Sequence, residues 1–157
     1  MPDTLNLGAG NQIIVPAAGD RVVNHDLRKH RAEISCAWDL NILPWPWADE
    51  SFDRIVAQAI LEHLHITLIQ SMDECWRLLR TGGTLDIRIP WWKHDNAYRD
   101  PTHYWRFSLS TLDIFDPDTD YGRDYRFYTD RKWRFLRKPG LSRYKTCLLY
   151  TSPSPRD

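Results

Sequence analysis

Five short segments with β-strand composition recur along the first 90 residues, and one long helical pattern separates the last two of them. In this helical pattern, residues 60–80, apolar side chains recur three or four positions apart. Strands that alternate with helices and loops are typical of an α/β domain, so we predict a mostly parallel sheet with flanking helices. The predicted strands are residues 4–7, 21–26, 35–40, 52–57 and 84–90, followed by a short helix over 110–115 and a strand or hairpin over 125–136.

Length and composition indicate one domain with a core of its own. The chain has 157 residues, of which 42% are hydrophobic, so it needs neither disulfides nor a structural metal to fold. Basic and acidic residues number 21 each, which argues against a surface devoted entirely to phosphate binding. The charge is uneven, because residues 1–90 hold 8 basic and 12 acidic side chains while residues 91–146 hold 12 and 8. Without a long apolar segment or a leader-like N-terminus, the sequence predicts a cytoplasmic protein that does not enter a membrane.

The last eleven residues differ abruptly from the arginine- and aromatic-rich sequence before them. Residues 147–157, CLLYTSPSPRD, match the translation of one reading frame of a transposon-based sequencing adapter. We therefore expect a domain over residues 1–146 that is incomplete at its C-terminus and lacks its last strand or strands. Residues 147–157 are then a non-native tail, with a short natural proline-rich tail as the alternative.

The residues that follow the predicted strands indicate a ligand site, because open α/β sheets bind ligands beyond the carboxyl ends of their strands. The turn Gly8-Ala9-Gly10 follows the first strand and allows backbone N–H groups to approach a ligand closely. Asp26 ends the second strand 18 residues after Gly8, near the spacing of about 20 at which an acid meets ribose hydroxyls. At the third strand, Asp39 could accept a hydrogen bond from an adenine amine beside the apolar Leu40. The alternatives are a tight turn without a ligand and surface or capping acids.

Four segments resemble class I S-adenosylmethionine-dependent methyltransferases, in particular the type 11-like methyltransferase domain. The segment DESFDRIVAQAILEHL, residues 49–64, resembles the fourth-strand motif of that family. The first-strand motif is matched by residues 5–11, the second by 25–27, and the helix and turn before the fifth strand by 74–85. The resemblance covers nearly all of residues 1–146 in the right order. It implies a Rossmann-like fold and methyl transfer from S-adenosylmethionine to an unidentified acceptor by in-line displacement.

The resemblance also implies which residues bind the cofactor. By position, Gly8, Ala9 and Gly10 line the methionine and ribose, Asp26 binds the ribose hydroxyls, Asp39 and Leu40 contact the adenine, and Gln58 contacts the methionine end. The chain departs from the family pattern in three respects. Asn6 replaces an acid, Asn11 and Gln12 stand where a third glycine is common, and the first helix is shortened, which weakens any contribution of its dipole.

Methyl transfer needs mainly alignment of a nucleophile with the sulfonium, so a general base is optional. The polar and aromatic segment 91–107 is the best place for one, and we predict His94, Asp95 and His103 as catalytic residues of an active-site lid. The alternative is a structural loop in which these histidines bond to the backbone. We expect a structural role for His63, and no metal, because His94, Asp95 and His103 lack a matching ligand spacing.

The segment Arg123–Lys145 carries nine positive and two negative side chains among several aromatic rings. This composition suits phosphates with stacked bases, and equally a strand that alternates solvated charges with buried rings. A nucleic-acid-binding module on a Rossmann-like scaffold and a noncatalytic methyltransferase relative therefore remain alternative functions. The missing third glycine and the motif after the fourth strand argue against a nicotinamide-dependent oxidoreductase.

Overall fold

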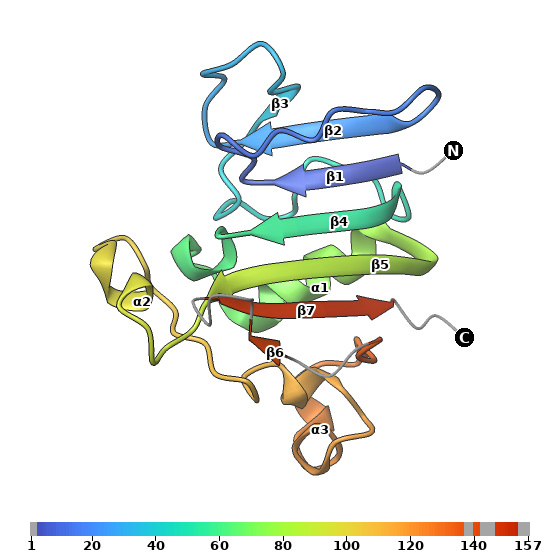
Figure 1. Ribbon diagram of the computed structural model, residues 1–157. Coiled ribbons are helices and arrows are strands. Elements are labelled where there is room, and N and C mark those ends of the chain that lie inside the picture. The colour runs from blue at the N-terminus through green and yellow to red at the C-terminus, as the bar shows by residue number, and fades with distance from the viewer. Residues whose placement is uncertain (1–2, 137–139, 142–146, 154–157) are drawn as a thin grey trace.

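The fold is built on one sheet whose strand order is β3-β2-β1-β4-β5-β7-β6 (Figure 1). The computed structural model describes residues 3–136 and, for the backbone alone, 140–141 and 147–153. Strands β1 to β5 pair in parallel, and β7 pairs antiparallel with β5 and β6, which confirms the predicted mostly parallel α/β fold. The strands are β1 (Asp3–Leu7), β2 (Arg21–Asp26), β3 (Cys36–Ala37), β4 (Phe52–Gln58), β5 (Leu79–Pro90), β6 (Gly140–Leu141) and β7 (Cys147–Pro153).

Strand β7 is formed by the segment that resembles translated adapter. Its backbone pairs with β5 from Thr84, opposite Pro153, to Pro90, opposite Cys147. Our sequence analysis left this segment out of the fold, whereas the structure uses it to cover the edge of β5, which would otherwise present unpaired backbone groups. Within residues 1–146, the described strands after β5 are limited to the two-residue β6. The proposed origin of the segment stays a prediction.

Helix α1 (Leu68–Leu78) is shorter than the predicted helix over 60–80. Thr67 caps its first turn in a reciprocal arrangement with Gln70, in which each side chain bonds to the other residue's backbone N–H. The preceding residues form a separate 3-10 turn, η1 (Leu61–His63). The helix ends where Leu79 begins β5 opposite Phe52, five residues before the predicted start of that strand.

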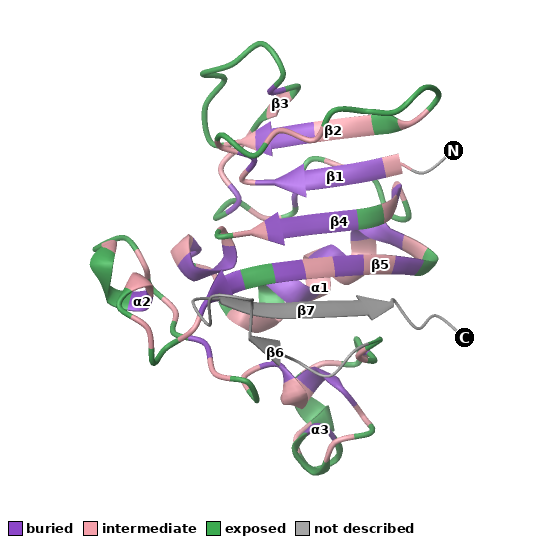
Figure 2. Cartoon of the chain, viewed as in Figure 1, coloured by how far each residue is buried: buried purple, intermediate pink, exposed green. Residues whose placement is uncertain are grey.

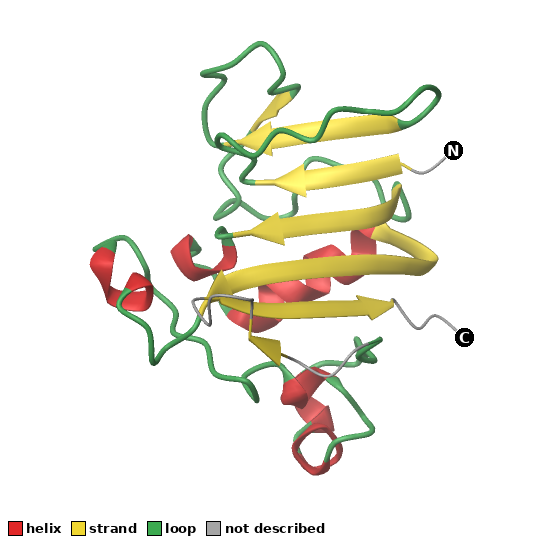
Figure 3. Cartoon of the chain, viewed as in Figure 1, coloured by secondary structure: helices red, strands yellow, loops and turns green. Residues whose placement is uncertain are grey.

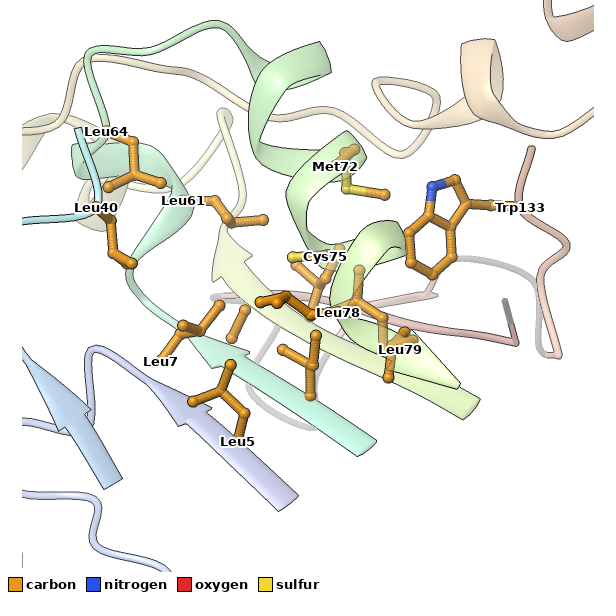
Figure 4. Close-up of a cluster of buried hydrophobic side chains, with 14 of the residues drawn as sticks. Leu5, Leu7, Leu40, Leu61, Leu64, Met72, Cys75, Leu78, Leu79 and Trp133 are labelled. Carbon is orange, nitrogen blue, oxygen red and sulfur yellow. The ribbon is translucent and has the colours of Figure 1, made fainter. Parts of the chain in front are cut away.

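The hydrophobic core lies between α1 and one face of the sheet (Figure 4). Helix α1 contributes Met72, Cys75 and Leu78, and the sheet contributes alternate residues such as Leu5 and Ile55. Because side chains alternate along a strand, the intervening residues point to the opposite face. Figure 2 shows that β1 and β4, near the centre of the sheet, are largely buried.

A loop rather than a helix connects β1 to β2 (Figure 3). The Asn24 side chain donates to the Ile14 carbonyl and accepts from the Ile14 N–H, each at 3.0 Å. Asn6 donates to the Gln12 carbonyl at 2.8 Å and to the Asn24 side-chain oxygen at 2.9 Å. Two buried amides thus hold this loop to the sheet, which gives a physical reason for asparagine at position 6.

Residues 91–136, which follow β5, are mostly irregular. They contain α2 (Asn96–Arg99), η2 (Asp113–Phe115), α3 (Asp120–Asp124) and η3 (Arg126–Tyr128). The predicted helix over 110–115 is therefore only a short turn, and the predicted strand over 125–136 is wrong. In place of a strand, Tyr125 stacks on Tyr128, and Trp133 is buried, with its backbone N–H donated to the Phe115 carbonyl. No helix in the described part of the chain is long and apolar enough to cross a membrane.

Candidate functional site

The carboxyl ends of β1, β2, β4 and β5 meet at one edge of the sheet, with α2 beside them (Figure 1). The parallel pairing brings the residues that follow each of these strands to the same edge. This is where open α/β sheets bind their ligands. Two neighbouring groups of side chains lie there, one around the glycine turn and one around η1.

The two glycines of the turn have different surroundings. Gly8 has a φ of +59° and Gly10 a φ of +50°, a region that residues with a Cβ rarely adopt. A Cβ on Gly8 would lie 2.7 Å from Ile60 Cδ1, so this glycine allows β1 to pack closely against the segment after β4. A Cβ on Gly10 would meet only the Gly8 carbonyl oxygen, at 3.9 Å. The space beside Gly10 is therefore open, as a cradle for a bound cofactor requires.

Asp26 lies directly against this turn. Its Oδ2 accepts a hydrogen bond from the Gly10 N–H at 2.8 Å, and its Oδ1 accepts one from the Leu27 N–H at 2.7 Å. Each carboxylate oxygen can accept more than one hydrogen bond, so both oxygens keep capacity for a pair of ligand hydroxyls. The open glycine turn and the hydrogen-bond acceptors of Asp26 fit the ribose of S-adenosylmethionine.

His25 connects the glycine turn to the end of β3. Its ring is buried, and Nδ1 accepts from the Gly8 N–H at 3.3 Å. Nε2 lies 2.9 Å from the Trp38 carbonyl oxygen, to which it donates, because a carbonyl can only accept. These two contacts define a neutral ring, and burial lowers the pKa of His25.

We predict that His25 makes the stability of the protein depend on pH. In the unfolded chain His25 binds a proton below about pH 6.5, whereas in the folded chain its lowered pKa keeps the ring neutral to lower pH. The free energy of unfolding therefore falls as the pH drops below about 6.5. Urea unfolding of the wild type and of His25→Asn between pH 8 and 5 measures the effect. The difference in free energy of unfolding between the wild type and His25→Asn should become smaller toward pH 5. A constant difference across this range would show that His25 does not stay neutral in the fold.

The remaining predicted cofactor residues lie along the same edge. Asp39 Oδ1 accepts from the backbone N–H of Asn41 at 2.9 Å and from its side-chain amide at 3.0 Å. Leu40 is buried, and its carbonyl accepts from the Trp45 indole N–H at 2.9 Å. Ala9 is buried in the turn, and Gln58 is the last residue of β4, opposite Arg88. The structure thus gathers these residues at the carboxyl edge, while their contacts with a cofactor stay predictions.

A cavity of about 490 Å³ opens between η1 and the loop after β5. Of the three predicted catalytic residues, only His103 lines it. His94 accepts a hydrogen bond from the Asn96 N–H at 3.1 Å, and Asp95 is exposed at the start of α2. The structure places His103 beside Glu62 and His63 and leaves His94 and Asp95 outside this group. The lining residues are Ala59, Glu62, Pro90, Asn96, Arg99, Asp100, Pro101 and His103.

Glu62 is the functional candidate that our sequence analysis missed. Its side chain is 1% exposed, and neither carboxylate oxygen has a hydrogen-bond partner among the described residues. Burial, with a smaller contribution from the negative charge of Asp100, raises the pKa of Glu62 to about 7. The nearest basic group among the described residues is His103, whose Nε2 lies 4.0 Å from Glu62 Oε1. The available signal was an acid next to a histidine within the mostly apolar segment 59–64 after β4.

The basic segment makes several contacts within the protein. The Arg131 guanidinium lies 4.1 Å from the centre of the Trp76 ring, and Lys132 donates to the Arg126 carbonyl. Arg123 pairs with Asp120. Residues 137–139 and 142–146 of this segment lie outside the described residues. Nucleic-acid binding through Arg123–Lys145 stays a prediction.

Comparison with solved structures shows the same fold in methyltransferases. A S-adenosylmethionine-dependent methyltransferase from Aquifex aeolicus superposes with a TM-score of 0.65 at 15% identity, covering 98% of this chain and 82% of the other. The YcgJ protein of Bacillus subtilis gives a TM-score of 0.63 at 14% identity, with 99% and 93% covered. A chain from the complex of the Haloferax volcanii Trm112 methyltransferase activator with a methyltransferase gives 0.65 at 14% identity, with 99% and 83% covered.

Sequence comparison identifies the family. No curated protein matches the sequence. The sequence model of a family described as "Methyltransferase domain" matches residues 5–87, from β1 through most of β5. Since this match covers more than half of the chain, the protein belongs to the methyltransferase domain family, with S-adenosylmethionine as the implied cofactor.

Proposed function

We propose that this protein transfers the methyl group of S-adenosylmethionine to an acceptor bound in the cavity between η1 and the loop after β5. The observation that carries the proposal is the Asp26 carboxylate, held by the Gly10 N–H next to open space at the carboxyl edge of the sheet. The cavity starts at Ala59, directly after Gln58, and so adjoins the proposed cofactor site.

In this proposal the chain binds and aligns the two substrates. When bound, the cofactor supplies an electrophilic methyl group on its sulfonium. Gly8, Ala9 and Gly10 line the methionine and ribose, and Asp26 accepts hydrogen bonds from the ribose hydroxyls. Asp39 and Leu40 contact the adenine, and Gln58 contacts the methionine end. Alignment of the acceptor with the methyl group provides most of the rate enhancement that such a transfer needs.

The catalytic proposal is best supported for His103, because this residue lines the cavity. His103 is held in place by Nδ1, which lies 3.3 Å from the Ala97 carbonyl oxygen. For His94 and Asp95, a catalytic role requires that the loop after β5 moves toward the acceptor, as in enzymes with a lid. The apolar Pro90 and Pro101 and the charged Arg99 also line the cavity and would contact the acceptor.

Calorimetric titration of the full chain with S-adenosylmethionine tests the cofactor site. We expect Asp26→Ala to weaken binding at least about 100-fold, because two hydrogen bonds to a charged acceptor, at about 1.5–3 kcal/mol each, are lost. Asp124→Ala, which removes an exposed acid on α3, should bind like the wild type. Thermal unfolding of both variants checks that they are folded. Absence of wild-type binding at high micromolar cofactor, or unchanged binding by Asp26→Ala, would contradict the proposal.

A further inference from the structure

Glu62, His63 and His103 converge at the wall of the cavity. One potential ligand atom from each residue lies within 4.8 Å of those from the other two. Glu62 and His63 belong to η1, and His103 comes from the loop after β5. The two imidazole rings are close, with centroids 4.6 Å apart and planes inclined by 75°.

The hydrogen bonds of His103 determine which ring nitrogen has a free lone pair. Nδ1 lies 3.3 Å from the Ala97 carbonyl oxygen, and a carbonyl can only accept, so Nδ1 carries the proton. In the neutral ring Nε2 then has the lone pair. This is the nitrogen that lies 4.0 Å from Glu62 Oε1.

A similar argument applies to His63. The Thr102 hydroxyl lies 2.7 Å from Asp100 Oδ1 and donates its single proton to that carboxylate. Thr102 Oγ1 is therefore an acceptor for His63 Nδ1, at 2.9 Å. The lone pair of the neutral His63 ring is then on Nε2. Histidines that bind metals are oriented in this way, with the other ring nitrogen donating to an outer oxygen.

Glu62 completes a group that consists only of electron-pair donors. Its carboxylate is buried, and neither oxygen receives a hydrogen bond from the described residues. Two imidazole rings and a carboxylate thus lie together, and the described residues donate no N–H or O–H group to the carboxylate. A buried carboxylate in such surroundings is stable only with a proton or a cation as partner.

We propose that Glu62, His63 and His103 bind a divalent transition-metal ion, with zinc as the best match. Two imidazoles and one carboxylate are typical zinc ligands, whereas magnesium and calcium prefer oxygen alone. Ligand atoms about 2.0 Å from a tetrahedral zinc lie about 3.3 Å apart, so Glu62 and His103 need to approach by less than an ångström. Three protein ligands leave one position open toward the cavity. The proposal that an ion binds depends only on the Glu62, His63 and His103 cluster. That an oxygen or nitrogen of the methyl acceptor would occupy the open position depends also on the proposed function.

Titration of the full chain, stripped of metal with a chelator, with zinc chloride tests the proposal by calorimetry. We expect one site in the wild type and no binding at that site in Glu62→Gln or His103→Ala. Thr102→Val, which removes the oxygen that orients His63, should weaken binding about 10-fold. His65→Ala is the matched control, because it removes an exposed imidazole two residues from His63 and should leave binding unchanged. Cobalt(II) in place of zinc adds a visible absorption band that reports tetrahedral coordination.

Equal zinc affinity in the wild type, Glu62→Gln and His103→Ala would overturn the proposal, as would absence of wild-type binding at micromolar zinc. Glu62→Gln preserves the shape of the side chain, and thermal unfolding without metal shows whether each variant is folded. Titration of the same samples with S-adenosylmethionine separates the two proposals. Loss of zinc binding with retained cofactor binding in His103→Ala supports the metal site, while zinc binding without cofactor binding in the wild type refutes only the proposed function.

Discussion

Gly8→Ala will lower the free energy of unfolding by about 2–5 kcal/mol, because it combines a strained backbone with overpacking. The new Cβ would lie 2.7–2.9 Å from three side-chain carbons of Ile60, at a φ of +59°. Either Ile60 or the turn must move, and both adjoin the proposed cofactor site. Urea unfolding of the purified variant measures the loss.

Gly10→Ala is the control for this prediction, since its φ of +50° carries a similar backbone strain without a close neighbour. We expect it to lose only about 1–2 kcal/mol of stability. Its methyl group would instead enter the open space beside Asp26, so cofactor binding should be lost in a folded protein. Equal destabilisation by the two substitutions would show that Gly8 has no special packing role.

Arg77→Met will destabilise the protein by about 2–4 kcal/mol, because it removes several charged hydrogen bonds from a partly buried position. The Arg77 guanidinium bonds to both oxygens of Glu74 and to Asp49, and it donates to the carbonyls of Trp45 and Trp47. These contacts hold the loop before β4 against α1. Urea unfolding of the variant gives the free energy directly.

The effect of Arg77→Met should extend to the cofactor site. Trp45 bonds to the Leu40 carbonyl, and Trp47 packs edge-on against His25 with ring centroids 5.5 Å apart. Arg54→Met is the control, because Arg54 pairs with Asp86 at the exposed face of the sheet, where a pair contributes less than about 1 kcal/mol. Similar losses in both variants would contradict the structural role assigned to Arg77.

The strands of the parallel sheet could be predicted from sequence because short β-branched and apolar runs mark them, and because Gly8 follows β1 and Asp26 ends β2. The start of α1 could not, because Leu61 and Leu64 continue the helical period although they lie in η1 and the following loop. The capping residues Thr67 and Gln70 were the local signal for the true start. In 125–136 the charge and aromatic pattern suggested a strand, but packing of Tyr125 and burial of Trp133 decide the conformation.

The two parts of the candidate site differ in how much of them the sequence predicts. The glycine turn and Asp26 follow from strand ends and spacing, because parallel strands bring those ends together. The grouping of Glu62 with His103 depends on a tertiary contact, in which the Glu62 carbonyl accepts from the N–H groups of Tyr104 at 2.6 Å and Trp105 at 3.1 Å. No local pattern in the sequence records that contact.

The pairing of β1 with β4 has a consequence for the order of folding. Paired residues are 18 positions apart between β1 and β2 and 30 between β4 and β5, but 50 between β1 and β4, as in Leu5 and Ile55. Among these three pairings, closing the loop between β1 and β4 costs the most chain entropy, so the pairs β1–β2 and β4–β5 are expected to form before β1 and β4 join. At one end of the β1–β4 pairing the Asp3 N–H donates to Asp53 Oδ2 at 2.7 Å, and at the other end Gly8 packs against Ile60. The glycine turn of the proposed cofactor site is thus completed when these two units join, so a ligand bound there would stabilise that step of assembly.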